Sequence, residues 1–159
     1  MSILEQKSNE NAEVAEEFID KVTRLNTALS RTYYAVFQKI KSVLIINEDF
    51  CSYYKNHPIS YKVTDKNGQV FEKDYKLFEH GFMPHVLKYF ADYRNQEYDN
   101  EKYDEISDEI DFLYNKRRES DYSEKIFFIH TNDTNKMVAK KSLEKMKTII
   151  DFIDAHICE

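Results

Sequence analysis

The amino-acid sequence predicts an all-α protein, a bundle of four to five helices that run up and down, with a small β-hairpin-like insertion. Only two glycines and two prolines occur among the 159 residues, so few residues end helices or form tight turns. Apolar residues also recur every three or four positions along most of the chain, which is the period of one helix face. Together these observations favour a few long amphipathic helices.

Length and composition fit a single helical domain over residues 1–159. Hydrophobic residues make up 42% of the chain and charged residues 33%, which provides both a core and a solvated surface. The net charge of −6 argues against general affinity for nucleic acid, because that affinity depends on cations that neutralise phosphates. Any contact with RNA is therefore expected to be local.

The first two helices follow from their apolar stripes. Helix one is expected over about residues 9–25 and helix two over about residues 26–46. The stripe of helix one consists of Val14, Phe18, Val22 and Leu25. The stripe of helix two contains Leu29, Val36, Ile40 and Val43. Further apolar residues widen the second stripe, so helix two is expected to lie centrally in the bundle.

An insertion is expected over about residues 47–79, where the helical pattern stops. The segments ISYKVT and QVFEKD flank the sequence DKNG. Its Asn67-Gly68 pair is a strong hairpin signal, because both residues tolerate positive φ angles. The insertion is therefore predicted to form a small β-hairpin.

Three more helices are expected after the insertion. Helix three should begin near Pro84 and end near residue 95, helix four should cover about residues 103–119, and helix five should run from about residue 134 to the end. The stripe of helix four contains Ile106, Ile110 and Leu113, and its next position is Arg117. The stripe of helix five suits a packing or dimerisation seam. It consists of Leu143, Met146, Ile150, Ile153 and Ile157.

The last helix also carries the one candidate basic patch for RNA. Its members are Lys136, Lys140, Lys141, Lys145 and Lys147. The alternative is that these lysines form the solvated face of an amphipathic helix.

Several classes of site find no support in the sequence. Cys51 and Cys158 fit neither a disulfide framework nor a metal-ligand spacing, so reduced thiols and a cytoplasmic location are expected. His80 and His85 are five residues apart, a poor helical spacing for two metal ligands. Glycine-rich phosphate-binding loops and membrane-spanning apolar runs are missing, so we expect no cofactor, no metal and no membrane partner.

Two motifs together carry a family resemblance. The segment SRTYYAVF at Ser30–Phe37 fits the pattern S-R-x-Y-Y-A-x-F, and Arg117, Asp121 and Tyr122 form the pattern R-x-x-x-D-Y. With the order of the expected helices, these motifs make the chain resemble the small stand-alone prokaryotic proteins of the HEPN superfamily. The resemblance spans most of the chain, although the insertion is longer than a minimal member needs.

The resemblance implies a homodimer that brings two copies of the arginine motif together in a cleft. It also implies a metal-independent endoribonuclease, or a toxin of a toxin–antitoxin or defence system, with RNA as a possible substrate. Many stand-alone members are neutralised by a cognate nucleotidyltransferase antitoxin, which is therefore a possible partner. In related pairs the partner adds nucleotide to a tyrosine near this motif, which makes Tyr122 a candidate modification site.

RNA cleavage without metal needs a base, an acid and a cation that stabilises the phosphorane. Arg117 suits the last role, because its planar fork stays charged and reaches two oxygens; alternatively it pairs with Asp121 or with a carboxylate of a partner chain. In the nuclease branch four to six residues lie between the arginine and a histidine. Here four residues lie between Arg117 and Tyr122, and the next histidine is His130. A tyrosine pKa of ~10 suits an acid better than a base, so Tyr122 or a displaced histidine is the expected proton donor, unless Tyr122 is structural.

Arg31, Tyr34 and Arg118 are the candidate binding residues. Arg31 and Tyr34 lie three residues apart on helix two and are expected either to line the cleft with Arg117 or to form part of the core. The missing histidine keeps a second functional class open, a non-catalytic HEPN module that binds a nucleotide or a protein partner.

Overall fold

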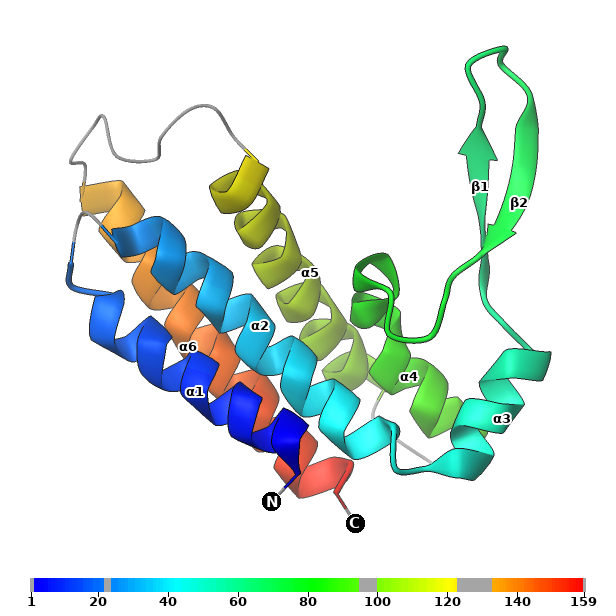
Figure 1. The fold of residues 1–159 in the computed structure, drawn as a ribbon, viewed down its shortest axis with the longest axis horizontal. Coiled ribbons are helices and arrows are strands. Elements are labelled where there is room, and N and C mark those ends of the chain that lie inside the picture. The colour runs from blue at the N-terminus through cyan, green and yellow to red at the C-terminus, as the bar shows by residue number, and fades with distance from the viewer. Residues whose placement is uncertain (1, 22–23, 95–99, 123–132, 159) are drawn as a thin grey trace.

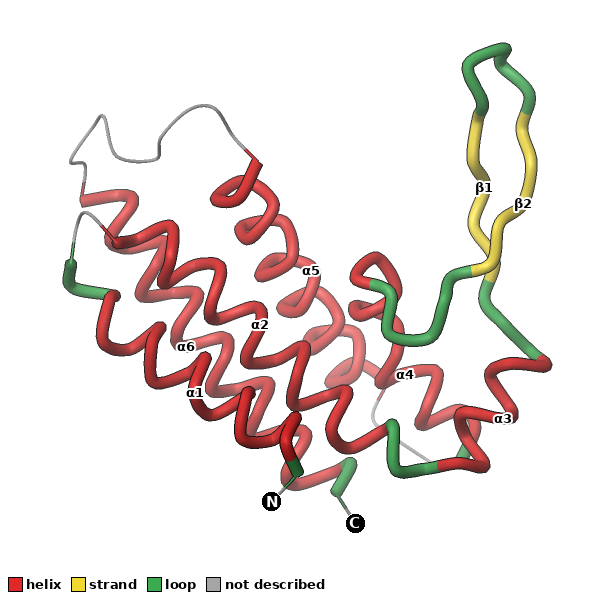
Figure 2. Tube along the Cα trace, viewed as in Figure 1, coloured by secondary structure: helices red, strands yellow, loops and turns green. Residues whose placement is uncertain are grey.

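The computed structural model describes residues 2–21, 24–94, 100–122 and 133–158, and these form a mostly helical protein (Figure 1). The α-helices of these ranges are α1 (Ile3–Phe18), α2 (Leu25–Leu44), α3 (Glu48–Asn56), α4 (Met83–Tyr93), α5 (Asn100–Tyr122) and α6 (Asp133–His156). A short 3-10 helix, η2 (His80–Phe82), precedes α4. The strands β1 (Ser60–Thr64) and β2 (Val70–Asp74) form a hairpin between α3 and α4 (Figure 2). The predicted all-α class with a hairpin insertion is confirmed at this level.

The central helix of the bundle is α2, as its wide apolar stripe predicts. It packs against α1, α5 and α6, which lie beside it along most of its length (Figure 1). Its fully buried side chains include Leu29, Tyr33, Ile40 and Leu44. Because α2 touches α1 on one side and α5 on the other, residues far apart in the sequence meet along it.

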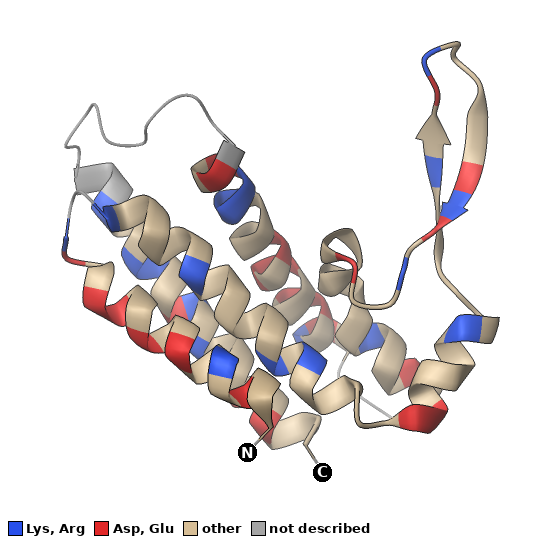
Figure 3. Cartoon of the chain, in the orientation of Figure 1, with Lys and Arg blue, Asp and Glu red and all other residues tan. Residues whose placement is uncertain are grey.

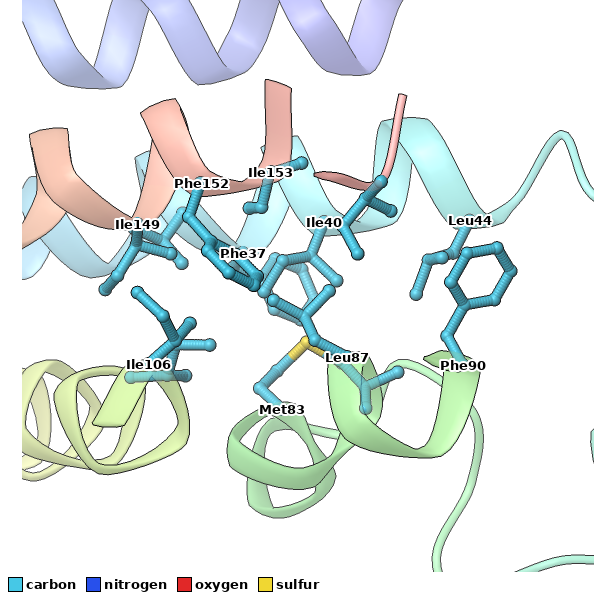
Figure 4. Close-up of a cluster of buried hydrophobic side chains, with 14 of the residues drawn as sticks. Phe37, Ile40, Leu44, Met83, Leu87, Phe90, Ile106, Ile149, Phe152 and Ile153 are labelled. Carbon is cyan, nitrogen blue, oxygen red and sulfur yellow. The ribbon is translucent and has the colours of Figure 1, made fainter. Parts of the chain in front are cut away.

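The main core joins α2 with α4, α5 and α6 (Figure 4). Each buried aliphatic or aromatic side chain there contributes roughly 1.5–3 kcal/mol relative to exposure. The labelled members are Phe37, Ile40, Leu44, Met83, Leu87, Phe90, Ile106, Ile149, Phe152 and Ile153.

The first helix lies earlier in the chain than the apolar spacing predicts. It begins at Ile3 because Ser2 and Glu5 form a capping box: the Ser2 hydroxyl accepts from the Glu5 amide, and the Glu5 carboxylate accepts from the Ser2 amide. It ends at Phe18, and Leu25 already belongs to α2. The expected helix over residues 9–25 is therefore wrong at both ends.

The insertion contains a helix as well as the predicted hairpin. Helix α3 is capped by Asn47, whose side chain accepts a hydrogen bond from the Phe50 amide, and it buries Phe50 and Tyr54 on one face. The hairpin itself turns through Asn67 and Gly68, as predicted, and Gly68 has a φ of +81°. The insertion is therefore more ordered than a hairpin alone.

The remaining helices follow their predicted stripes. Pro84 lies in the first turn of α4, and α5 extends beyond the predicted helix at both ends. On α6, Met146, Ile153 and Ile157 are buried within the chain itself, so the seam is used for internal packing. No helix in the described ranges is long and apolar enough to span a membrane.

Candidate functional site

Arg117 is the buried cation of the candidate site. It continues the apolar stripe of α5, as predicted from the sequence, and only 8% of its surface is exposed. Its Nη2 donates a hydrogen bond of 2.8 Å to the Tyr34 hydroxyl of α2. Its Nε lies 2.7 Å from Oδ2 of Asp121, one helical turn further along α5; the contact is an ion pair, since the N–H is not aligned as in a hydrogen bond. The predicted Arg117–Asp121 pair is therefore present.

Two tyrosine rings of the SRTYYAVF segment lie against this guanidinium. The Arg117 Cζ atom is 5.3 Å from the ring centre of Tyr34 and 6.0 Å from that of Tyr33. Both distances are in the range of cation–π attraction, which is stronger where water is excluded. The two motifs that carry the family resemblance thus meet in one place, although Tyr34 and Arg117 are 83 positions apart in the sequence.

His80 enters the same site from η2. Its Nδ1 lies 2.7 Å from the hydroxyl of Tyr33, and its ring centre is 4.6 Å from that of Phe37 and 6.0 Å from that of Tyr34. Burial, and then the positive charge of Arg117, lower the pKa of His80, while Glu79 opposes the shift. Since the ordinary histidine pKa is about 6.5, His80 is mainly neutral at pH 7.

The Tyr33 hydroxyl fixes one side of the imidazole. Tyr33 is fully buried, and burial raises its pKa far above the ordinary value, so the hydroxyl stays protonated near neutral pH. It either donates to Nδ1 of His80 or accepts from an Nδ1–H. These two arrangements leave His80 Nε2 as a proton donor or a proton acceptor, respectively.

The turn before α4 places His80 at the site. Phe82 is fully buried, and Gly81 allows a close approach of Tyr75, since a Cβ at Gly81 would lie 3.2 Å from Tyr75 Cε1. Phe78 has a φ of +65°, which is rare for a bulky residue and reverses the chain ahead of η2. The base of the hairpin and the histidine are therefore one packed unit.

Arg31 and Tyr34 line a second feature, a pocket of about 430 Å³ between α1 and α2. The Arg31 Nη1 donates to Oδ1 of Asn11 on α1 at 2.9 Å, and Lys7 and Gln38 also line the pocket. Tyr34 thus lies between this pocket and Arg117. Arg31 is exposed and shares this pocket with Tyr34, whose hydroxyl contacts Arg117. The predicted cleft of Arg31, Tyr34 and Arg117 stays a prediction.

The other predicted site residues contribute less. Arg118 is exposed, and its guanidinium lies 5.6 Å from the Tyr114 ring centre. Tyr122 is the last residue of α5, but its side chain and the whole of His130 lie outside the described residues. The role predicted for Tyr122 therefore stays a prediction.

The lysine-rich face of α6 is largely neutralised by acidic neighbours. Lys136 pairs with Asp20 at 3.0 Å, Lys147 with Glu16 at 2.7 Å, and Lys145 with Glu109 at 3.0 Å. Figure 3 shows acidic residues along α1 and α5. The geometry favours the solvated helix face over a basic RNA patch.

His80 is the site residue that the sequence did not reveal. In the sequence His80 follows the predicted hairpin, and its spacing from His85 suggested only the question of a metal site. Its approach to Arg117 depends on how η2 folds back onto α2, which no local spacing encodes. Within the described residues, no group of three metal-ligating side chains occurs.

The site therefore combines a neutral imidazole, a fixed cation and a polarisable tyrosine network. These are the groups needed to move a proton and to stabilise negative charge on a phosphate or acyl group. In comparisons with known proteins, no protein-family model, no curated protein and no solved structure matches this chain.

Proposed function

We propose that this chain is a HEPN-type, metal-independent endoribonuclease in which His80 transfers protons and Arg117 stabilises the phosphorane. The observation that carries the proposal is the convergence of His80, Tyr33 and Arg117 at one place on α2. In this proposal, His80 supplies the imidazole that the R-x-x-x-D-Y motif lacks. A displaced histidine thus supports a nuclease where the motif alone argued against one.

In the proposed reaction, neutral His80 takes the proton of an RNA 2′-hydroxyl. The 2′-oxygen attacks the adjacent phosphorus, the bond from phosphorus to the 5′-oxygen breaks, and the leaving oxygen receives a proton. The products are a 2′,3′-cyclic phosphate and a 5′-hydroxyl. Arg117 offsets the charge that develops on the non-bridging oxygens, and a fixed cation needs no reorganisation at that moment.

The biological setting proposed with this activity is a cytoplasmic toxin or defence protein. A homodimer would supply two copies of the site, so that the acid and the base come from different histidines or from His80 and Tyr122. A cognate nucleotidyltransferase is the proposed antitoxin. The HEPN resemblance carries these three statements.

A non-catalytic module is the second candidate, and the burial of Arg117 favours it. The guanidinium is held by Asp121 on one side and by Tyr34 on the other, which is also how a structural arginine is satisfied. In that case the pocket lined by Arg31 and Tyr34 binds a nucleotide or a protein segment without cleavage.

The two candidates are separated by incubating purified protein with cellular RNA in excess EDTA. We expect the wild type to cleave, and His80→Gln and Arg117→Ala to lose at least about 100-fold in rate, the scale of general acid–base catalysis. The matched control is His85→Gln, since His85 is exposed on α4. All variants should keep the helical circular dichroism spectrum.

If the wild type leaves RNA intact, or if His80→Gln cleaves as fast as His85→Gln, the nuclease proposal is refuted. Binding of a nucleotide by a protein that cleaves nothing would then support the second candidate.

A further inference from the structure

The β1–β2 hairpin stands away from the helices and has two different faces (Figure 1). In the antiparallel register Tyr61 lies opposite Lys73, and Val63 lies opposite Phe71. Directly opposed residues share a face, so these four side chains form one face, named here the aromatic face. The other face carries Ser60, Lys62, Thr64, Val70, Glu72 and Asp74.

The aromatic face is accessible and holds no carboxylate. Phe71 is 48% exposed, Lys73 is exposed, and Tyr61 and Val63 are half-buried. By contrast, both carboxylates of the strands, Glu72 and Asp74, belong to the opposite face. The face therefore offers two aromatic rings and one cation without a competing negative charge.

Several acidic side chains in and around the hairpin accept hydrogen bonds, whereas the lysines there are available to a ligand. Asp65 accepts hydrogen bonds from the amides of Asn67 and Gln69, Asp74 accepts from the Ser60 hydroxyl, and Glu79 accepts from the Lys76 amide. The lysines are exposed and form no ion pair within the described residues. These lysines are Lys62, Lys66, Lys73 and Lys76. This differs from α6, where Lys136, Lys145 and Lys147 are paired with acidic residues.

A column of aromatic rings connects the aromatic face to the candidate site. Tyr61 stacks on Tyr75 with ring centres 4.2 Å apart, and Tyr75 stacks on Phe82 at 5.9 Å. Phe82 belongs to η2, the same short helix that carries His80. The hairpin is further held at its base, because the Tyr54 hydroxyl donates to the Tyr75 carbonyl at 3.0 Å.

From this geometry we infer that the aromatic face binds single-stranded RNA and leads it toward His80 and Arg117. The inference rests on the proposed function for the choice of ligand. Bases of any sequence stack on exposed aromatic rings, and nearby lysines neutralise the backbone, which is how single strands are held without sequence preference. The exposed Lys73, unpaired within the described residues, and the lack of a strand carboxylate on this face make the anionic strand a better fit than an acidic protein surface, and the ring column connects the face to η2, which carries His80.

The test measures binding of a labelled oligouridylate of about twelve nucleotides by fluorescence anisotropy, in a His80→Gln background that prevents the proposed cleavage. Phe71→Ala should weaken binding about fivefold or more, the effect of losing one stacked base. Lys73→Ala should also weaken binding and lower the slope of log Kd against log salt by about 0.7, because one phosphate contact is lost.

Matched controls come from the opposite face. Val70→Ala on the same strand and Lys62→Ala on the neighbouring strand also change exposed residues of the hairpin, and both variants should bind as the parent does. Circular dichroism and gel filtration of each variant monitor folding and oligomeric state.

Equal Kd values for the variants of the two faces would overturn the inference, as would no binding by the parent protein. A change of oligomeric state in Phe71→Ala alone would also overturn it, because the face would then contact a second copy. Cleavage by the wild type with unaffected binding in Phe71→Ala and Lys73→Ala refutes the hairpin inference alone. Face-dependent binding without any cleavage by the wild type refutes the nuclease proposal alone.

Discussion

At the residue scale, the candidate site depends on a few polar groups whose burial affects their hydrogen-bond energies and pKa values. The Tyr34 hydroxyl accepts a hydrogen bond from the guanidinium of Arg117, a buried residue, so removing the hydroxyl leaves a buried donor without that partner. His80 likewise has its pKa lowered by the same burial and by the same cation. The sequence singled out Arg117 by its place on the apolar stripe and by the R-x-x-x-D-Y motif, and the ion pair with Asp121 was one of the alternatives it left open.

Tyr34→Phe is expected to destabilise the protein by about 1–3 kcal/mol, since it removes a hydrogen bond to a charged group while keeping the ring against Arg117. The free energy of unfolding in urea measures this. Tyr61→Phe is the matched control, because its hydroxyl has no hydrogen bond within the described residues. A Tyr34→Phe variant as stable as that control would show that the Arg117–Tyr34 bond contributes nothing.

At the element scale, an element could be predicted from the sequence where a strong local pattern determines it. The stripes of α2, α5 and α6 and the Asn67-Gly68 turn are local signals, and they were predicted. The position of α1 was missed because the capping box of Ser2 and Glu5 outweighs the apolar spacing near Leu25. Helix α3 was missed because its nine residues bury only Phe50 and Tyr54, too few for a visible stripe.

Ser2→Ala should therefore destabilise the protein by about 1 kcal/mol and increase exchange of amide hydrogens in the first turn of α1, because the cap is lost. Hydrogen exchange read by mass spectrometry locates the effect. The matched control is Ser52→Ala on the exposed side of α3, where no cap is removed. Equal exchange in the first turn of α1 for the two variants would contradict the capping account.

At the scale of the whole molecule, the candidate site forms because the fold brings three elements together that are far apart in the sequence. Helix α2 contributes Tyr33 and Tyr34, α5 contributes Arg117 and Asp121, and η2 contributes His80. Only the helix memberships can be predicted from the sequence. The arrival of His80 depends on the fold-back of the hairpin base onto Gly81 and Phe82, which is a tertiary interaction. For that reason nothing in the sequence indicated that His80 lies near Arg117.

The convergence of His80 and Arg117 is tested most directly by the NMR titration of His80, assigned by comparison with His80→Gln. Because its pKa is lowered, the folded-state imidazole of His80 takes up a proton at a lower pH than an ordinary histidine, whose pKa is about 6.5. Between the two pKa values the folded state therefore binds fewer protons than the unfolded state, and the stability that neutral His80 contributes is lost as the pH falls through this window. In the wild type we expect a midpoint below 6.5. In Arg117→Gln the midpoint should rise partway toward 6.5, because the cation is removed while burial remains. A wild-type midpoint at or above 6.5, or the same midpoint in both proteins, would contradict the account.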